Sequence, residues 1–373
     1  MNTHDDLLHW ALAKGVQSNG ILLQAICGRG VGIVAARPLE AGEVLLTVPA
    51  EAFRTLHTVP KHISRKLPRD ISLHALLATW LALDNRSDFA PWNTMFPTLP
   101  DFEAGTPLLW PEELQDLLPK PAKDILRKQQ FKFQRDWDIV SKTFPDISRE
   151  KYLYSWLLVN SRSFYYTTPR MEKLPHDDRL ALMPLADLFN HADSGIETSF
   201  SRQSYTFTTD RAYREGEEIH VSYGGHSNDF LLAEYGFVLA ENQFDAVYLD
   251  ELILPRLNKE QEDALKDKAF LGNYTLDRET PGCFRTQVAL RIFCCTRKEW
   301  ERFTDAEVDS ERSQRRVNVL LVQLLGRFVG EIHQTLGEIE KLNVGLECQR
   351  KLLAQRWKQI ETMVTQTLKR LSN

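Results

Sequence analysis

The sequence predicts an α+β protein in which two blocks of short β-strands flank a large helical insertion and an all-α segment follows. Apolar runs of strand length, punctuated by Gly and Pro, lie between residues 21 and 49 and again between residues 198 and 222. Apolar positions at helical spacing fill the region between these blocks and return after Asp250. With 373 residues, 43% of them hydrophobic, the chain is long enough for two or three compact units.

The first strand block follows a short amphipathic helix that we expect over residues 5–16. The strand Ile21–Ile26 runs into three glycines at alternating positions in Gly28–Gly32, a spacing close to the fingerprint of dinucleotide-binding folds. Fingerprint glycines open a helix, whereas these lead into Ile33–Ala36 and then Glu43–Val48, which predicts strand, turn and strand. Glycines at a strand end let a ligand approach the backbone closely. A plain hairpin with glycines at its bends is the alternative.

The helical insertion is expected over about residues 53–175. Residues 73–81 and 153–159 each place apolar side chains on one helical face, and proline-rich loops mark the helix ends. Arg162 follows the second of these stretches, between serines and aromatic residues. It is a candidate site residue, with a surface salt bridge as the alternative.

The second strand block begins where the apolar run Leu182–Leu185 is followed by Asp187–His191. We interpret the acidic stretch Glu215–Glu218 as a solvated hairpin turn rather than a metal site. The strands expected in this block are Thr198–Phe200, Tyr205–Phe207 and Ile219–Ser222.

Asn190, His191 and Tyr223 stand out because each follows an apolar run, where an unpaired polar group would destabilise the fold. The sequence contains neither a nucleophile elbow nor a set of histidines at zinc-binding spacing. It therefore argues against hydrolysis by a catalytic triad and against zinc catalysis. A tyrosine, with a reference pKa of ~10, is a poor base at neutral pH but orients an amine well. These residues indicate a small-molecule site at the strand ends, with satisfied core polar groups as the alternative.

The last part of the chain is predicted to be helical. Ser227-Asn228 can cap a helix over residues 229–235, and Gly236 is placed to end it. Apolar positions follow helical spacing from Val317 to Ile339, and Gly345 separates this stretch from a last helix. We expect the apolar stripe to form the core of a C-terminal domain, with a partner-binding groove as the alternative.

Composition and charge argue against several classes of function. The net charge of −5 gives no basic field for nucleic acid, and the longest apolar stretch, Leu73–Leu83, is far short of the ~20 residues that cross a bilayer. The five cysteines form no C-x-x-C pair, which argues against a disulfide framework or a cysteine-rich zinc site. Residues 1–6 are acidic and lack the features of a targeting segment. We therefore expect a cytoplasmic or nuclear protein without a metal. We also expect a monomer.

Five blocks in order resemble the SET-domain protein methyltransferases of the Rubisco large-subunit methyltransferase type. Single motifs such as Asn-His or Tyr-Gly are common, but five in one order are specific. The resemblance covers nearly the whole chain, and Gly282–Arg291 is similar to that family's helical C-terminal domain. The blocks are Gly28-Arg29-Gly30, Ser161–Phe164, Asp187–His191, Tyr223–Asn228 and Leu231–Phe237.

The resemblance implies a SET domain over residues 1–245, with its helical insertion at about 53–175, and a helical substrate-binding domain over residues 246–373. It implies transfer of a methyl group from S-adenosylmethionine to a lysine side chain of a protein substrate. Tyr223 corresponds to the catalytic tyrosine, which also faces the substrate, and Phe164 and Tyr166 to the aromatic wall around the target lysine. The residues implied to hold the cofactor are Gly28, Arg29, Gly30, Arg162, Asp187, Asn190, His191 and Tyr235.

Two departures from the wider family narrow the expected substrate. Many histone-directed SET enzymes carry a cysteine-rich zinc module after the tyrosine block, and its absence here favours a non-histone protein. No transit peptide is visible, which argues against a chloroplast role, so ribosomal or other soluble proteins are expected. Two alternatives stay open: a methyltransferase that acts on a protein histidine, and a binding module that keeps the fold without catalysis.

Overall fold

The computed structural model describes residues 3–84, 89–305 and 311–372, and the chain divides into two compact units. The first unit comprises Met1–Glu103 with Arg127–Gly225, and the second comprises Ala104–Leu126 with His226–Asn373. The division falls inside two helices, α5 (Leu99–Gly105) and α7 (Lys120–Thr143). Within the described ranges no helix combines the length and the hydropathy that crossing a membrane requires.

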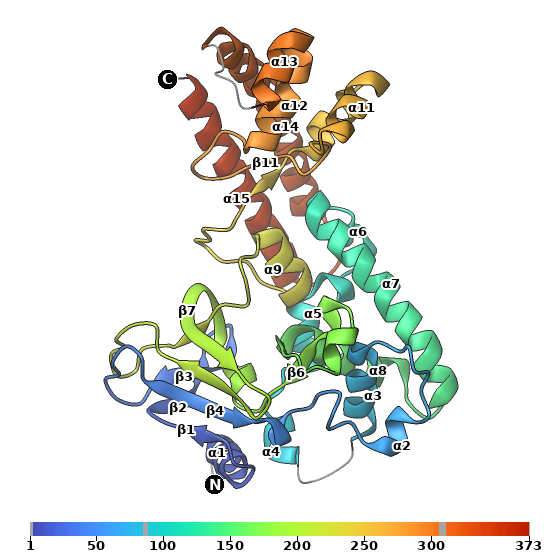
Figure 1. Ribbon diagram of the computed structural model, residues 1–373, viewed down its shortest axis with the longest axis vertical. Coiled ribbons are helices and arrows are strands. Elements are labelled where there is room, and N and C mark those ends of the chain that lie inside the picture. The colour runs from blue at the N-terminus through green and yellow to red at the C-terminus, as the bar shows by residue number, and fades with distance from the viewer. Residues whose placement is uncertain (1–2, 85–88, 306–310, 373) are drawn as a thin grey trace. The chain divides into compact units, whose positions relative to one another are not determined.

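A five-stranded sheet organises the first unit, with the strand order β1-β4-β8-β7-β9; Figure 1 labels its strands β1, β4 and β7. β8 pairs antiparallel with β4 and β7, whereas β7 and β9 are parallel. Two further antiparallel pairs, β2-β3 and β5-β6, form separate small sheets. The strands are β1 (Gln17–Ser18), β2 (Ile21–Ile26), β3 (Gly30–Ala35), β4 (Val44–Pro49), β5 (Ser163–Tyr165), β6 (Leu180–Leu182), β7 (Asn190–Phe200), β8 (Ser204–Thr208) and β9 (His220–Val221).

The parallel pair β7-β9 carries an irregularity that shapes the site. Asn190 and His191 align with His220 and Val221, after which the register jumps so that Ile196 also aligns with Val221. The irregularity presses Gly195 against β9, because a Cβ there would lie 2.3 Å from the His220 carbonyl oxygen. Only glycine fits this approach, so Gly195 lets the first residues of β7 stay paired with β9.

The helical insertion of the first unit packs through α3 and α8, which both begin at a serine cap. The Ser72 and Ser148 hydroxyls each accept a hydrogen bond from a backbone N–H of the first turn. The two helices meet where the ring of His74 stacks on Trp156, with ring centroids 4.5 Å apart. The helices wholly within this unit are α1 (Thr3–Ala13), α2 (Lys61–Ser64), α3 (Leu73–Leu83), α4 (Ala90–Asn93) and α8 (Arg149–Arg162).

The second unit is mainly helical, as predicted, and its core lies around the long helices α14 and α15 (Figure 1). Leu321 and Leu325 of α14 share this core with Ile360 and Val364 of α15. The short antiparallel pair β10-β11 is an addition that the sequence did not predict. The elements are α6 (Glu112–Gln115), α9 (Asn228–Tyr235), β10 (Val247–Tyr248), α10 (Asp250–Ile253), α11 (Lys259–Asp267), β11 (Thr275–Leu276), α12 (Phe284–Cys294), α13 (Arg297–Thr304), α14 (Glu311–Lys341) and α15 (Glu347–Ser372).

Both ends of α9 agree with the sequence prediction. The Ser227 hydroxyl caps the helix by accepting a hydrogen bond from Phe230 N, and Gly236 ends it with a φ of 80°. Glycine adopts this left-handed conformation without a Cβ penalty. The local signals around the helix were therefore sufficient to place it.

A buried arginine ties α9 to α15 within the second unit. Arg356 donates to Asp229 through Nε and to Asp245 through Nη1, at 2.7 Å in both cases. All three side chains are buried, so one guanidinium pairs with two carboxylates away from water. A buried charge is stable only when it is paired and hydrogen-bonded. The position of α9 therefore depends on a residue of the last helix.

Candidate active site

His191 and Tyr223 come together because β7 and β9 pair in parallel. His191 is the second residue of β7, and β9 ends two residues before Tyr223. The Tyr223 backbone N–H donates to His191 Nδ1 at 3.0 Å, and the two rings stack with centroids 4.9 Å apart. Nδ1 also lies 3.4 Å from the Val221 carbonyl oxygen, but the shorter contact is the one in which Nδ1 accepts from Tyr223 N–H.

The Tyr223 hydroxyl donates a hydrogen bond to the Phe189 carbonyl oxygen at 2.8 Å. Burial raises the pKa of Tyr223 to about 12; Arg162 opposes this shift, and Asp187 and Glu218 add to it. The phenol therefore stays protonated at physiological pH and does not act as a base. What it offers a neighbouring group is the dipole of its hydroxyl.

Asn190 is held in place by Glu218, which lies just before β9. Asn190 Nδ2 donates to Glu218 Oε1 at 2.8 Å, and Arg29 Nη2 donates to Glu218 Oε2 at 2.7 Å. Gly32 of β3 lies against both partners, because a Cβ there would be 2.9 Å from Asn190 Nδ2 and 3.1 Å from Glu218 Oε1. The hydrogen bond to Glu218 and the close contact with Gly32 therefore fix the position of the Asn190 side-chain amide.

The turn between β2 and β3 presents open backbone beside this cluster. Gly28 and Gly30 both have a φ of 73°, and an added Cβ at either residue would meet nothing within 4 Å. Backbone conformation rather than crowding therefore requires glycine here. Between them, the Arg29 side chain is half exposed and pairs with Glu218. A ligand can approach the backbone of this turn closely.

Arg162 and Asp187 form a third part of the site. Arg162 Nη1 donates to the Asp187 carbonyl oxygen at 2.5 Å and lies 3.6 Å from its carboxylate. Trp92 Nε1 lies 3.1 and 3.2 Å from the two carboxylate oxygens. Burial raises the pKa of Asp187 to about 6, while Arg162 and Trp92 act to lower it. Arg162 Nε is buried without a hydrogen-bond partner in the described part of the chain, so this guanidinium has a donor to spare.

Phe164 of β5 belongs to a row of aromatic side chains that reaches Phe189. Its ring packs edge-on against Phe207 at 5.7 Å and Tyr205 at 5.9 Å, and Phe207 in turn stacks on Phe189 at 5.4 Å. Phe189 supplies the carbonyl oxygen that accepts from the Tyr223 hydroxyl. The row therefore places Phe164 on an apolar wall that continues to the acceptor of Tyr223.

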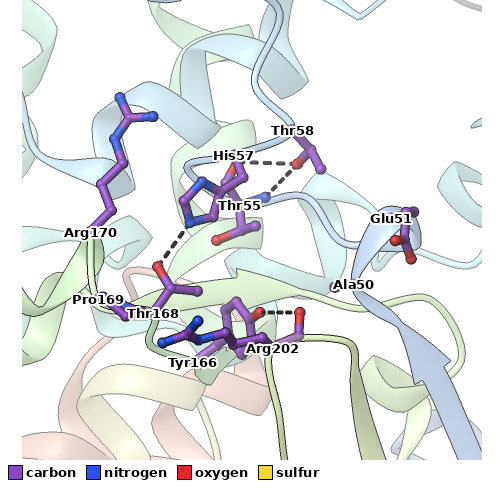
Figure 2. Close-up of a pocket in the computed structure, with 10 residues that line it drawn as sticks. All are labelled: Ala50, Glu51, Thr55, His57, Thr58, Tyr166, Thr168, Pro169, Arg170 and Arg202. Carbon is purple, nitrogen blue, oxygen red and sulfur yellow. Dashed lines mark hydrogen bonds between the residues drawn. The ribbon is translucent and has the colours of Figure 1, made fainter.

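Tyr166 lies two residues beyond Phe164 and lines another cavity (Figure 2). Its ring is buried against Phe53 and Phe200, and its hydroxyl donates to the Arg202 carbonyl oxygen at 3.4 Å. The residues that line this cavity do not include the Asn190 cluster. The role of Tyr166 at a lysine channel stays a prediction.

Tyr235 is the one expected cofactor residue that lies in the second unit. It is the last residue of α9, and ring contacts relate it to Phe230 and Phe237, with centroids 6.4 and 6.2 Å apart. Its contact with a cofactor stays a prediction.

The sequence did not point to two residues of the cluster, Glu218 and Trp92. A turn is present at Gly216, but the Glu218 side chain is only 13% exposed and bonds Asn190, so its interpretation as solvated was wrong. Strand alternation places Glu218 with His220, 3.5 Å away, on the side opposite the buried Ile219 and Val221, so it gives no signal for the burial of Glu218. Trp92 lies on the short helix α4, far from Asp187 in sequence, and no local pattern marks it.

Comparison with known protein families yields two matches that together span most of the chain. The family model of the SET domain matches residues 30–224, and that of the ribosomal lysine N-methyltransferase 2 C-terminal domain matches residues 245–370.

Among individual relatives, SET domain-containing protein 4 of Mus musculus is 26% identical, over 91% of this chain and 84% of its own. Ribosomal lysine N-methyltransferase set11 of Schizosaccharomyces pombe is 27% identical, over 81% and 77%. Actin-histidine N-methyltransferase of Danio rerio is 27% identical, over 65% and 43%.

Solved structures with the same fold cover the whole chain. The SET domain of LSMT bound to lysine and AdoHcy has a TM-score of 0.67 at 15% identity, covering 100% of this chain and 92% of that one. Rubisco LSMT bound to AdoMet has a TM-score of 0.64 at 14% identity, covering 100% and 93%. At these identities the likeness establishes the fold alone. The predicted SET fold, with short sheets, a helical insertion and C-terminal helices, is confirmed.

Proposed function

Because the chain belongs to the SET-domain family, we propose that it is an S-adenosylmethionine-dependent protein-lysine N-methyltransferase. The observation that carries this proposal is the cluster of Asn190, His191 and Tyr223, which the pairing of β7 and β9 builds and Glu218 supports. Similarity to proteins named ribosomal lysine N-methyltransferases supports lysine as the acceptor and a protein as the substrate.

The residues of the site fit S-adenosylmethionine. Arg162 has a buried Nε–H without a described partner, which suits the carboxylate of the cofactor's amino-acid part. The open turn at Gly28 and Gly30 admits a ligand to the backbone, and Asn190 and His191 add polar groups. When bound, S-adenosylmethionine supplies the methyl group on a positively charged sulfonium. The family resemblance adds Arg29, Asp187 and Tyr235 to the proposed cofactor residues.

The chain's own groups suit methyl transfer without a strong base. Tyr223 stays protonated, and its hydroxyl and the Phe189 carbonyl oxygen offer fixed dipoles near the acceptor. The lysine amine attacks in its neutral form after its proton leaves to water, and an apolar wall at Phe164 disfavours the charged ammonium. Holding this amine in line with the transferred methyl group supplies most of the rate effect.

Phe164 favours lysine over histidine as the acceptor. A histidine acceptor needs a polar group that orients the imidazole, and the Phe164 ring, packed on the rings of Tyr205 and Phe207, has none. An aromatic wall suits the methylene chain of lysine and the methylated cation that forms. Transfer to histidine stays the second candidate because actin-histidine N-methyltransferases are among the relatives.

The proposal extends to the organisation of the protein and to its partner. We assign residues 1–245 to the SET domain and residues 246–373 to a domain that binds the protein substrate, supported by the family match at residues 245–370. The substrate is a ribosomal or other soluble non-histone protein met in the cytoplasm or nucleus. We propose that the enzyme acts as a monomer, without nucleic acid or membrane as a partner.

A methyl-transfer assay on cell extract tests the proposal. The full-length protein and its Tyr223→Phe variant are incubated with methyl-labelled S-adenosylmethionine, and mass spectrometry identifies the labelled residue. We expect label on lysine, and a rate about 10²-fold lower in Tyr223→Phe because the variant lacks the hydroxyl dipole. Cofactor affinity, measured by calorimetry, should be the same in both proteins.

Label on histidine would establish the second candidate instead. Absence of label, together with absence of calorimetric binding of S-adenosylmethionine to the folded protein, would refute methyltransferase activity. Equal rates in the two proteins would remove Tyr223 from the mechanism.

A further inference from the structure

The cavity beside Tyr166 is a feature of the first unit that the proposed reaction does not use (Figure 2). It has a volume of about 400 Å³, and its walls come from the end of β4, the loop at residues 55–58, the segment after β5 and the β7-β8 hairpin. Two arginines, Arg170 and Arg202, and one carboxylate, Glu51, line it. Its volume lies within the range of ligand pockets, and charged side chains on its rim can meet a charged group of a partner.

The two arginines of the cavity have no counterion among the residues that the structure describes. Neither the Arg170 nor the Arg202 side chain forms a hydrogen bond or ion pair with any described residue, and both residues are exposed. Among the other exposed arginines of this unit, Arg37 and Arg211 are each paired with a glutamate, at 2.8 and 2.7 Å, whereas Arg69 has no partner among the described residues. The cavity therefore holds two cationic groups whose donors are available to a ligand.

Both arginines extend from anchored backbone. Beside Arg170, Met171 is fully buried, and its backbone N–H donates to the Thr168 carbonyl oxygen at 2.8 Å. At the hairpin tip that carries Arg202, Ser201 N donates to Ser204 O at 2.9 Å. The cations are thus presented by fixed loops, which reduces the entropy that binding a ligand would cost.

The remaining polar groups leave the cavity with an excess of positive charge. His57 Nε2 and the Thr168 hydroxyl are hydrogen-bonded at 2.8 Å. Burial, and then the charge of Arg170, lower the pKa of His57, so its ring is neutral at pH 7. Glu51 is the single acidic residue of the lining, and Figure 2 shows it on the side away from Arg170. The arginine side of the cavity suits an anion.

Phe164 lies in β5, and Tyr166, which lines the cavity, continues the same strand direction just after β5. Phe164 and Tyr166 are two residues apart, and Tyr166 extends the β5-β6 ladder through a bond from its N–H to Arg179 O at 3.0 Å. Alternate residues of a strand point to one face about 7 Å apart. A substrate peptide in extended form covers that distance in about two residues.

We propose that this cavity is a substrate subsite for an aspartate or glutamate side chain that lies about two or three residues from the acceptor lysine. Figure 2 draws the guanidinium groups of Arg170 and Arg202 apart, so either one binds the carboxylate through charge-assisted hydrogen bonds. The inference rests on the proposed function, since it takes Phe164 to mark the acceptor end. Glu51 restricts the acidic side chain to the arginine side.

Binding of defined peptides to the full-length protein tests the subsite. Each fluorescent peptide has one lysine in an alanine and glycine background and one glutamate, moved one position at a time; matched peptides carry glutamine instead. At low salt we expect the glutamate peptide of the right spacing to bind about fivefold tighter than its glutamine partner. The double variant Arg170→Gln/Arg202→Gln should lose this preference, and Glu51→Gln should increase it. Arg69→Gln, an exposed arginine outside the cavity, serves as the matched control.

Equal binding of glutamate and glutamine peptides by the wild-type protein would overturn the subsite, as would a preference that survives in the double variant. The same peptides, and cell extract, are then assayed for methyl transfer from labelled S-adenosylmethionine. Transfer without any preference for glutamate overturns the subsite alone. A preference in binding without methyl transfer to peptide or extract overturns the proposed enzyme, because the cavity is then an acidic-peptide site only.

Discussion

Replacing Gly32 by alanine is expected to displace Asn190 from its place in the proposed cofactor site. The added Cβ lies 2.8 Å from Ile26 Cγ1, 2.9 Å from Asn190 Nδ2 and 3.1 Å from Glu218 Oε1. Favourable contacts between such atoms begin at about 3.5 Å, so these groups must retreat by roughly half an ångström. Gly32 is not among the glycines with positive φ, so alanine meets no backbone penalty and the effect is steric.

The size of this effect follows from two known magnitudes. Overpacking a well-packed site lowers the free energy of unfolding by about 1–3 kcal/mol. Misplacing a binding group by a fraction of an ångström should weaken S-adenosylmethionine binding about tenfold. Calorimetric titration and thermal unfolding measure the two effects on one preparation. The control is Gly330→Ala on α14, where an added Cβ meets nothing within 4 Å, and there stability should rise by about 0.5–1 kcal/mol.

A double variant identifies Asn190 as the group displaced. Asn190→Ala removes the amide that the new methyl group meets, so Gly32→Ala/Asn190→Ala should lose less stability than the sum of the two single variants. If Gly32→Ala binds the cofactor and unfolds like the wild-type protein, packing of Asn190 and Glu218 against Gly32 does not position the site.

Two further predictions concern buried charges. Arg356→Met leaves Asp229 and Asp245 buried without a cation, so the free energy of unfolding in urea should fall by about 3–5 kcal/mol. The control is Lys351→Met, at an exposed position on the same helix. An unchanged urea midpoint in Arg356→Met would contradict the role of this buried network. Burial raises the pKa of Asp187 to about 6 in the folded state, above about 3.9 in an unfolded chain. Its contribution to stability is therefore full below about pH 4 and lost as the pH rises through about 6, by about 3 kcal/mol. Asp187→Asn has no carboxyl group at this position and should lack this pH dependence. The difference in unfolding free energy between the wild-type protein and Asp187→Asn should therefore change between about pH 4 and 6. A difference that stays constant over this pH range would refute the raised pKa of Asp187.

Local patterns were sufficient for most elements and for the polar residues of the site. Asn190 and Tyr223 were marked by the apolar runs before them, and the strand–turn–strand pattern around Gly28 separated this chain from nucleotide-binding folds. Other features depend on contacts that no local pattern contains. The parallel pairing of β7 with β9, and the register jump that Gly195 permits, join segments about thirty residues apart.

Glu218 shows why part of the site was not predictable. The residues from Glu215 to Glu218 have the composition of a solvated turn, and a turn does form. Whether the last carboxylate is buried depends on its partners Asn190 and Arg29, which lie 28 and 189 residues away. The free energy of a buried carboxylate is decided by such distant partners rather than by its neighbours in sequence.

The position of Arg356 in the chain has a consequence for synthesis. Arg356 follows Asp229 by 127 residues and Asp245 by 111. A ribosome releases the chain from its N-terminus, so α9 emerges long before the arginine that neutralises its first turn. Until then both carboxylates must remain in water, because a buried carboxylate without a cation is unstable. A nascent chain that already contains Asn190, His191 and Tyr223 can pack α9 against earlier residues such as Leu114, but it lacks the cation for Asp229 and Asp245 until α15 has been made.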